Sequence, residues 1–407
     1  MKLNDLLSDI TINLKKQSHS FIDNLTSKSY YFWIGIIIIG LILKILFFPI
    51  KLGDYNTYLG PWVDFIKNNG YFESLKFDFY NYAPSYIYIL ILIAKTGFNS
   101  LYMIKLVSIL FEFILAFFVG KILFLKYKDT TVFWISSAII PLIPSIFING
   151  AYWGQCDSIY TTFVIAGIYY SLINKQFISV ILLATAIAFK VQAVFILPYY
   201  FVLLLFGKTK WYYFISIPIV YFISVLPAWL YGRHLTDLFS IYLNQSDYYQ
   251  SLTMFMPNIY VWFEDADYKT FKIAGILLTA TLTVISGIYL KIKKINLNQD
   301  NLILLAFASL IITPFILPGM HERYLYSGDV IAFAFLLWFK QNLRIPLSIW
   351  VVSFYAYISC SRLKELLPSW PAFFVYLTAI ILTLRLLKLQ LKEYPKNKVK
   401  QSDNVSI

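Results

Sequence analysis

Four polar residues, His321, Glu322, Arg323 and Tyr324, stand in a row between two apolar runs of the chain. A guanidinium beside an imidazole suits a phosphate group, because the first offers paired hydrogen-bond donors and the second a tunable donor. Glu322 and Tyr324 are placed to orient those two side chains. An ordinary polar connecting loop is the alternative, and the pattern alone leaves both interpretations open.

A carboxylate, Asp54, follows the first apolar run directly, in the segment GDYNTYLGPWVDF. At the edge of a membrane it would be partly desolvated, which suits a general base that accepts a proton from a hydroxyl group. The alternative is an ordinary loop acid, and position alone favours that interpretation. Asp64 lies ten residues further on, and this spacing does not predict a metal site.

Trp153, Gln155 and Asp157 cluster in NGAYWGQCDSIYTTF (149–163), where one apolar run ends and the next begins. A tryptophan, an amide and a carboxylate at such a boundary are candidates for substrate binding. Asp157 is equally plausible as a helix N-cap or first-turn acid. Trp153 is equally plausible as an interfacial anchor.

Lys190 and Gln192 interrupt an apolar hairpin in AIAFKVQAVFILP (186–198). A lysine within or at the edge of a membrane predicts a functional role. Two alternatives are open: its ammonium group reaches the interface, or it pairs with Glu112, the acid inside the third apolar run.

The composition excludes a water-soluble globular protein. Of 407 residues, 59% are hydrophobic and only 14% are charged, against about a quarter in soluble domains. The net charge of +13 is spread over short clusters between the apolar runs and at both ends of the sequence. This pattern is typical of cytoplasmic loops and lipid headgroups, so we expect no nucleic-acid partner. Two cysteines do not indicate a disulfide framework.

The apolar runs predict an all-α polytopic membrane protein with about 12–13 membrane helices and a long first external loop. The thirteen runs lie near residues 30–49, 82–97, 101–124, 131–149, 158–173, 177–189, 191–206, 211–230, 269–290, 301–318, 328–340, 345–361 and 371–390. We expect a cytoplasmic segment over 1–29, a single transmembrane domain over 30–390 and a cytoplasmic tail over 391–407. The polar N-terminal segment lacks the pattern of a signal peptide, so we expect the first run to remain as an anchor.

The basic clusters set the expected orientation, because positively charged loops stay in the cytoplasm. This places the loops 50–81 and 231–268 outside, both rich in aromatic residues, Asn and Asp. The assignment is consistent only if 82–124 makes one net crossing. Either 82–97 is re-entrant, or the basic residues of 121–128 break the rule.

The order of these motifs resembles a known family. An acid after the first run is followed by WGQCD, KVQ, MPNIYVWF and HERY. This order is similar to that of the GT-C superfamily of polyprenyl-phosphate-sugar glycosyltransferases. The resemblance covers about residues 30–330. It is greatest to bacterial relatives of the mannosyltransferase that adds the second mannose to GPI anchors.

The resemblance implies a role for each matching residue. Asp54 would be the catalytic base. His321, Arg323 and Lys190 would bind the donor phosphate, and the substrate would also contact Trp153, Gln155, Asp157, Gln192, Glu322, Tyr324 and Asn258. Val191 and Ala83 stand where the family more often has proline. The resemblance implies no cofactor and no metal.

The implied activity is inverting transfer of a hexose (mannose, glucose or galactose) from a polyprenyl-phosphate sugar to a hydroxyl group of a glycan or glycolipid. The donor lipid would be undecaprenyl or dolichyl phosphate. The Ile-, Lys- and Asn-rich composition is typical of an AT-rich bacterium and favours undecaprenyl phosphate. We expect the reaction on the external face of the cell membrane, or in the endoplasmic reticulum membrane of a eukaryote.

Two other classes of protein fit parts of the pattern. A flippase or transporter of lipid-linked sugars would also use intramembrane Lys190 and Glu112, although the sequence shows no inverted repeat. A polysaccharide polymerase or ligase would depend on Arg233 and His234 more than on Asp54.

Overall fold

A computed structural model describes residues 23–24, 27–263, 265–340, 342–360 and 368–402, with side chains described up to Leu389. The described residues are mostly helical, and two short strands, β1 (Thr253–Met254) and β2 (Met320–His321), pair with each other. The prediction of an all-α membrane protein is confirmed at this level. Most of the predicted segment 1–29 lies outside the described residues. The predicted tail 391–407 continues the last helix as far as Ser402, and residues 403–407 lie outside the described part.

The apolar helices fall into two length classes. Five described helices are long and apolar enough to cross a membrane, or six if a bent pair over Thr131–Trp153 forms one span. Five further apolar helices have 10–17 residues. These lengths support a polytopic protein, and the predicted total of 12–13 membrane helices stays a prediction.

The described chain divides into two compact units. Unit 2 comprises Ser20–Val194 and Trp211–Gln250, whereas unit 1 comprises Phe195–Lys210 and Ser251–Ile407 besides undescribed N-terminal residues. Because the chain leaves unit 2 twice, this division is not visible in the order of the apolar runs. The predicted domain boundaries at residues 29 and 390 stay predictions.

Unit 2 consists of α-helices joined by short 3₁₀- and π-helical segments. Its α-helices are α2 (Tyr30–Leu46), α3 (Gly60–Asn68), α4 (Pro84–Lys95), α5 (Ser100–Tyr127), α6 (Thr131–Ile139), α7 (Pro144–Phe147), α8 (Asp157–Leu172), α9 (Gln176–Phe189), α11 (Ser216–Leu230) and α12 (Leu235–Asp247). The short segments are η1 (Tyr55–Leu59), η2 (Tyr71–Lys76), η3 (Ile140–Leu142), η4 (Ile148–Trp153) and η6 (Trp211–Ile215). The segment η5 (Val191–Ile196) crosses the boundary between the units.

The helix α5 lies at the centre of this unit, against α6 and α8, and α8 packs in turn against α9. Asn99 caps its start by accepting a hydrogen bond from the backbone N–H of Tyr102 at 3.3 Å. The run predicted over 131–149 is broken, with a bend of 65° where Pro144 begins α7. A proline favours such a break because it cannot donate a backbone hydrogen bond.

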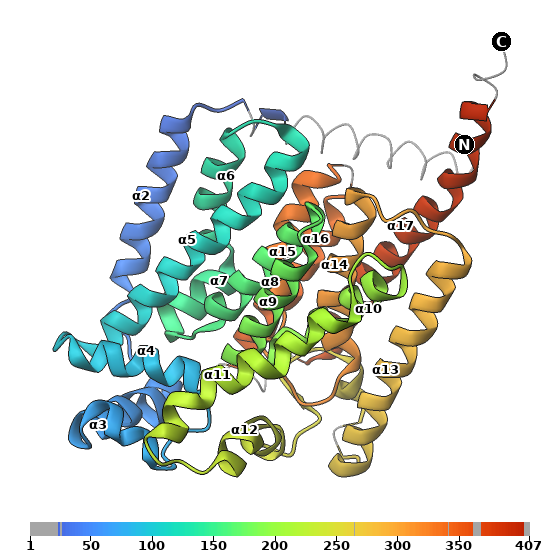
Figure 1. Cartoon of the computed structure of the whole chain (residues 1–407). Helices are drawn as coiled ribbons and strands as arrows, with labels where there is room; N and C mark the ends of the chain where they lie inside the picture. Colours follow the sequence, from blue (N-terminus) through green and yellow to red (C-terminus); the bar gives the residue numbers. More distant parts are fainter. Residues whose placement is uncertain (1–22, 25–26, 264, 341, 361–367, 403–407) are drawn as a thin grey trace. The chain divides into compact units, whose positions relative to one another are not determined.

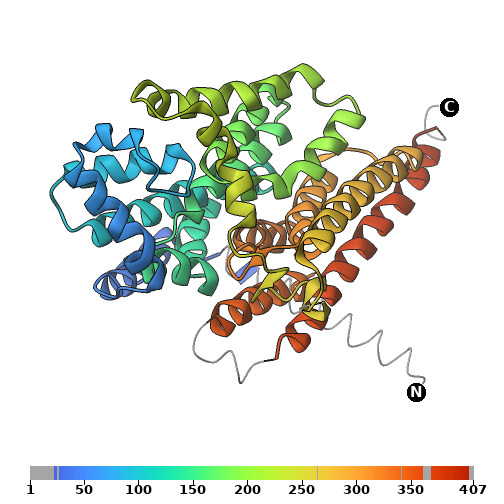
Figure 2. The ribbon, with the colours of Figure 1, turned by 90° about the horizontal axis from the view of Figure 1, so that it is seen from below.

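The segments predicted as the long loops 50–81 and 231–268 contain helices, so their description as loops was incomplete. In Figure 1, α3 and α12 lie at the lower end of unit 2, and Figure 2 looks onto this end from below. Buried residues of α3, α4, α11 and α12 form one apolar cluster, which includes Trp62, Ile66, Leu90, Val225 and Leu238. This packing gives the chain that follows Asp54 a fixed base, since Tyr55 and Leu59 belong to it.

The short helix α4 bears on the predicted topology. It has 12 residues, too few to cross a bilayer upright. Figure 1 shows it lying crosswise to α2 at the lower end of the unit. The choice between a re-entrant 82–97 and an exception to the rule at 121–128 stays a prediction.

Unit 1 is built around two helices that are buried along almost their whole length, α14 (Gln299–Ile316) and α15 (Tyr326–Trp338). The remaining helices are α10 (Leu197–Leu205), η7 (Ile259–Trp262), α13 (Tyr268–Ile292), α16 (Arg344–Ser359) and α17 (Trp370–Ser402). Most of α13 is exposed although it is strongly apolar, as a lipid-facing helix would be. The HERY residues lie in the connection between α14 and α15, as predicted.

Candidate functional site

In unit 2 the chain brings Asp54 and Gln155 together. The side-chain amide of Gln155 donates a hydrogen bond to Oδ2 of Asp54 across a separation of 101 residues. Gln155 is buried, whereas Asp54 is half-buried and lies where the chain turns from α2 into η1. The amide therefore fixes the orientation of a carboxylate that keeps access to its surroundings.

A glycine makes the turn that presents Gln155. Gly154 follows η4 with a φ of +71°, in the left-handed region that glycine adopts without strain. The turn is closed by hydrogen bonds from the N–H of Gly154 to the carbonyl of Gly150 (3.1 Å) and from the N–H of Gln155 to that of Asn149 (2.9 Å). Trp153, at the end of η4, is half-buried.

Asp157 and Lys190 form a buried ion pair beside this turn. Oδ1 of Asp157 accepts from the Lys190 ammonium group, and Oδ2 accepts from the Asn149 amide at 2.7 Å. The ammonium also lies 5.5 Å from the ring centre of Tyr82 and 5.9 Å from that of Tyr160, which are favourable cation–π distances. Asp157 is the first residue of α8, so its interpretation as a first-turn acid is confirmed.

The two alternatives considered for Lys190 are wrong. Its side chain is 4% exposed and is enclosed by protein, so its ammonium does not reach out to the interface. Nor does it pair with Glu112, because that carboxylate pairs with Lys44 at 2.7 Å. The sequence shows each of these charges but not which opposite charge the fold brings to it.

Gln192 is buried, and its Oε1 has no hydrogen-bond partner among the described residues. A buried polar atom without a partner costs about 1–3 kcal/mol. A hydroxyl or amide group of a ligand would offset that cost. The predicted role of Gln192 in substrate binding stays a prediction.

In unit 1, the two strands hold the HERY segment in place. β2 pairs with β1 in parallel, with Met254 opposite His321. The N–H of Gly319 donates to the carbonyl of Leu252 at 2.8 Å, immediately before the strand. The fold thus brings the segment that contains MPNIYVWF and the segment that contains HERY side by side.

Asn258 ties these two segments together. Its side-chain amide donates to the carbonyl of Leu317 at 3.1 Å, and its Oδ1 accepts from the N–H of Tyr260 at 3.0 Å. The residue is fully buried. In the described structure Asn258 therefore stabilises the chain next to HERY through these hydrogen bonds. Its predicted contact with substrate stays a prediction.

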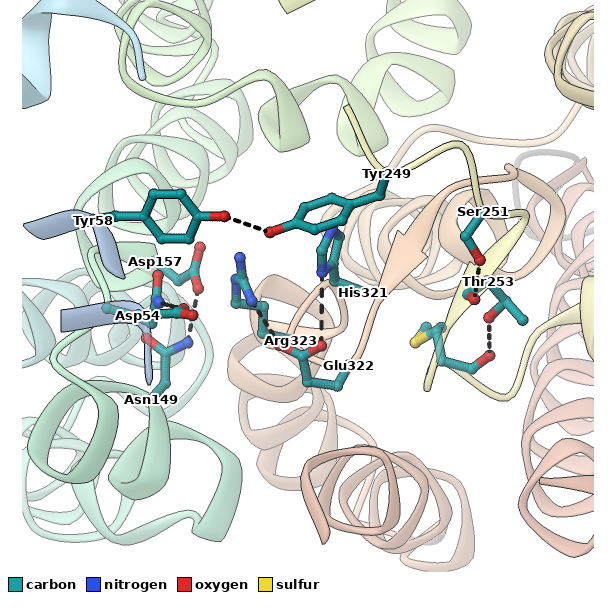
Figure 3. A network of polar contacts seen from close by, with 12 residues as sticks. Asp54, Tyr58, Asn149, Asp157, Tyr249, Ser251, Thr253, His321, Glu322 and Arg323 are labelled. Carbon is teal, nitrogen blue, oxygen red and sulfur yellow. Dashed lines mark hydrogen bonds and ion pairs between the residues drawn. The ribbon is translucent and has the colours of Figure 1, made fainter. Parts of the chain in front are cut away.

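Within HERY, Glu322 lies between the imidazole of His321 and the guanidinium of Arg323 (Figure 3). Its Oε1 lies 2.6 Å from Nη1 of Arg323 and its Oε2 lies 3.7 Å from Nδ1 of His321. Burial disfavours ionisation of Glu322, but the charge of Arg323 and the contacts with His321 outweigh it and lower the pKa to about 2. The carboxylate is therefore ionised at neutral pH and orients both side chains, as the sequence predicted.

The side chains of Arg323 and His321 keep some exposure, 14% and 11%, whereas that of Glu322 is 2% exposed. The ring centre of Tyr324 lies 5.0 Å from that of His321 and 6.0 Å from that of Phe195. A guanidinium and an imidazole held by one buried carboxylate form a preorganised set of donors. Such a set suits a phosphate group.

The sequence reasoning missed several residues of these clusters. Asn149 stood in the quoted segment NGAYWGQCD, and its position eight residues before Asp157 was the available signal. Tyr58 and Tyr249 join the two predicted external loops through their hydroxyl groups at 3.1 Å (Figure 3), and nothing in the sequence pointed to this pair. Among the described residues, no three His, Cys, Asp or Glu side chains are grouped closely enough to hold a metal ion.

The predicted residues thus form two clusters. Unit 2 brings together Asp54, Gln155, Asp157 and Lys190, and unit 1 holds the HERY residues next to Asn258. That both clusters serve one site stays a prediction. Comparison with family models, curated proteins and solved structures found no match for this chain.

Proposed function

We propose that the protein is a membrane-bound, inverting hexosyltransferase of the GT-C type. It would move a hexose from a polyprenyl-phosphate sugar to a hydroxyl group of a glycan or glycolipid on the external face of the cell membrane. The observation that carries the proposal is the hydrogen bond from Gln155 to Asp54. It joins an acid after the first apolar run to the WGQCD segment, next to the buried pair of Asp157 and Lys190.

The proposed reaction is a single displacement. The acceptor hydroxyl attacks the anomeric carbon while Asp54 takes its proton. A bond forms between the acceptor oxygen and the anomeric carbon, and the bond from that carbon to the phosphate oxygen breaks with its electron pair left on the phosphate. Arg323 and His321 would stabilise the charge that grows on the phosphate, since both are already oriented by Glu322.

The structure qualifies the role proposed for Lys190. Its ammonium group is engaged by Asp157 and enclosed by two tyrosine rings. A donor phosphate would have to share it with that carboxylate. We therefore assign the main phosphate contacts to His321 and Arg323, and give Lys190 the secondary role of holding Asp157.

The polymerase alternative has less support. Arg233 is buried, pairs with Asp78 and lies 4.3 Å from the ring centre of Tyr80. Its neighbour His234 is exposed and lies at the N-cap position of α12. The two side chains do not form a shared donor set of the kind that HERY forms.

The test uses purified protein in lipid nanodiscs, with radiolabelled polyprenyl-phosphate sugars and a membrane-lipid extract. We expect label transfer from one donor, and a loss of about 10²–10⁴-fold in Asp54→Asn, the contribution typical of a general base. Asp64→Asn is the matched control, because Asp64 is an exposed acid on α3, ten residues after Asp54. Wild-type transfer by Asp54→Asn would contradict the assignment of Asp54. If no donor is used but donors cross the bilayer, the protein is a flippase.

A further inference from the structure

The helix α5 carries none of the residues proposed to act, yet three of its buried side chains are polar. These are Lys105, Ser108 and Glu112, each at most 2% exposed. Spacings of three and four residues place them on one face of the helix. That face contacts the segments that carry Asp54 and Gln155.

Lys105 holds the end of α2. Its ammonium group donates to the backbone carbonyls of Phe47 and Ile50, both at 2.8 Å, and lies 3.4 Å from that of Phe48. The last carbonyls of a helix have no partner within the helix, and a cation there is favourable. The three N–H donors of a lysine thus fix the path of the chain just before Asp54.

The same helix holds the chain on the other side of Asp54. The hydroxyl of Tyr55 lies 2.8 Å from that of Ser100 at the start of α5. Asp54 is therefore bracketed by two attachments to one helix, through Ile50 and through Tyr55.

α5 also holds the partner of Asp54. The hydroxyl of Ser108 donates to the backbone carbonyl of Gln155 at 2.6 Å. The stem of Lys105 runs past Gly154, where an added Cβ would meet its Cγ at 3.5 Å. Lys105 thus lies between the end of α2 and the turn that presents Gln155.

We propose that Lys105 is a positioning residue. Through its hydrogen bonds to the backbone carbonyls at the end of α2, it sets the position and orientation of the Asp54 carboxylate. The proposal rests on the proposed function. A reacting group displaced by about 1 Å can lose about a hundredfold in rate. The donor contacts assigned to HERY do not depend on Lys105, so its loss should lower kcat and leave the KM for donor nearly unchanged.

The test compares Lys105→Met with wild type in nanodiscs. Methionine keeps the apolar stem beside Gly154 and removes all three donors. We expect faster amide hydrogen exchange in peptides over 47–59 and unchanged exchange over 317–325. We also expect kcat to fall by about tenfold to a hundredfold, with the KM for donor within about twofold of wild type.

Lys121→Met is the matched control. Lys121 is on the same helix, and its ammonium lies over the rings of Phe117 and Tyr169. We expect it to leave exchange over 47–59 and kcat unchanged. Where Lys105→Met does not give folded protein, Lys105→Gln replaces it. The glutamine amide keeps two of the three N–H donors. We therefore expect Lys105→Gln to change exchange and kcat in the same direction as Lys105→Met, but by less.

The outcomes separate the two proposals. Wild-type exchange over 47–59 together with wild-type kcat in the Lys105 variant overturns the positioning role. A rise in KM with constant kcat also overturns it, because Lys105 would then act on binding. Faster exchange in a protein whose wild type transfers no sugar leaves Lys105 as the residue that fixes the Asp54 segment and rejects the proposed function.

Discussion

The side-chain amide of Gln155 donates a hydrogen bond to the carboxylate of Asp54, although 101 residues separate them in the sequence. The contact gives Asp54 one defined orientation, since Gln155 is itself buried and its backbone carbonyl is held by Ser108. A base with a fixed lone-pair direction is what proton removal from a positioned hydroxyl requires.

We therefore predict that Gln155→Leu lowers kcat by at least about tenfold, because the carboxylate loses its orienting donor. The measurement is label transfer at saturating donor. Gln176→Leu is the control, since Gln176, the first residue of α9, is also buried but donates to the backbone carbonyl of Ser171 near the end of α8. Equal rates in the two variants would remove Gln155 from the proposed site.

The buried pair of Asp157 and Lys190 gives a second prediction. Asp157→Asn or Lys190→Met alone leaves an uncompensated buried charge, which costs about 3–5 kcal/mol of stability. The double variant has no such charge, so it should recover a large part of the loss. The measurement is the free energy of unfolding in mixed micelles.

Activity of the same double variant separates two roles of Lys190. If Lys190 only holds Asp157, the folded double variant should keep a KM for the donor near that of wild type. If it also binds the donor phosphate, the KM should rise even where stability is recovered. Because Asp157 is itself a predicted substrate contact, only a rise in KM beyond that of Asp157→Asn alone would confirm the role that the resemblance implied for Lys190, whose ammonium Asp157 engages.

Glu322 predicts a dependence of stability on pH. Its pKa in the folded protein is about 2, below the ordinary value of 4.5, because Arg323 and His321 outweigh the effect of burial. A lowered pKa means that the ionised carboxylate stabilises the fold above about pH 4.5 and that this contribution is lost as pH falls through about 2. We expect the unfolding free energies of wild type and Glu322→Gln to differ by a constant amount from pH 7 to about 5. The difference should shrink below about pH 4.5, and a difference that shrinks between pH 7 and 6 would contradict this assignment.

The helices could be predicted because a long apolar run is a local property of the sequence. The run predicted over 269–290 is the helix Tyr268–Ile292, and the run over 177–189 is Gln176–Phe189. α3 and α12 were missed because each is short and mixes polar and apolar residues, so neither forms a continuous run. Their helical form depends on packing against α4 and α11.

The residue types of the candidate site could also be predicted, but their pairing could not. Lys190 and Glu112 were the charges that the sequence singled out, whereas the fold gives each another partner, Asp157 and Lys44. Ion pairing is decided by which helices meet, and the sequence order does not contain that information. Lys44 and Lys105 also lie inside apolar runs, as Lys190 does. A charge at membrane depth is costly unless it is paired or hydrogen-bonded, so the sequence could have marked both lysines as candidates for buried contacts.

The pair of Lys44 and Glu112 leads to the last prediction, at Gly150. A Cβ added there would lie 2.1 Å from Oε1 of Glu112, whose carboxylate is held by Lys44 at 2.7 Å. Gly150→Ala must therefore displace a buried charge from its partner, and overpacking of this kind costs about 1–3 kcal/mol or more. Gly35→Ala in α2 is the control, because nothing lies within 4 Å of its added Cβ and alanine is the better helix former. Thermal unfolding in detergent should show a lower Tm for Gly150→Ala and an equal or higher Tm for Gly35→Ala. Equal stability of the two variants would mean that the Glu112 carboxylate does not pack against η4.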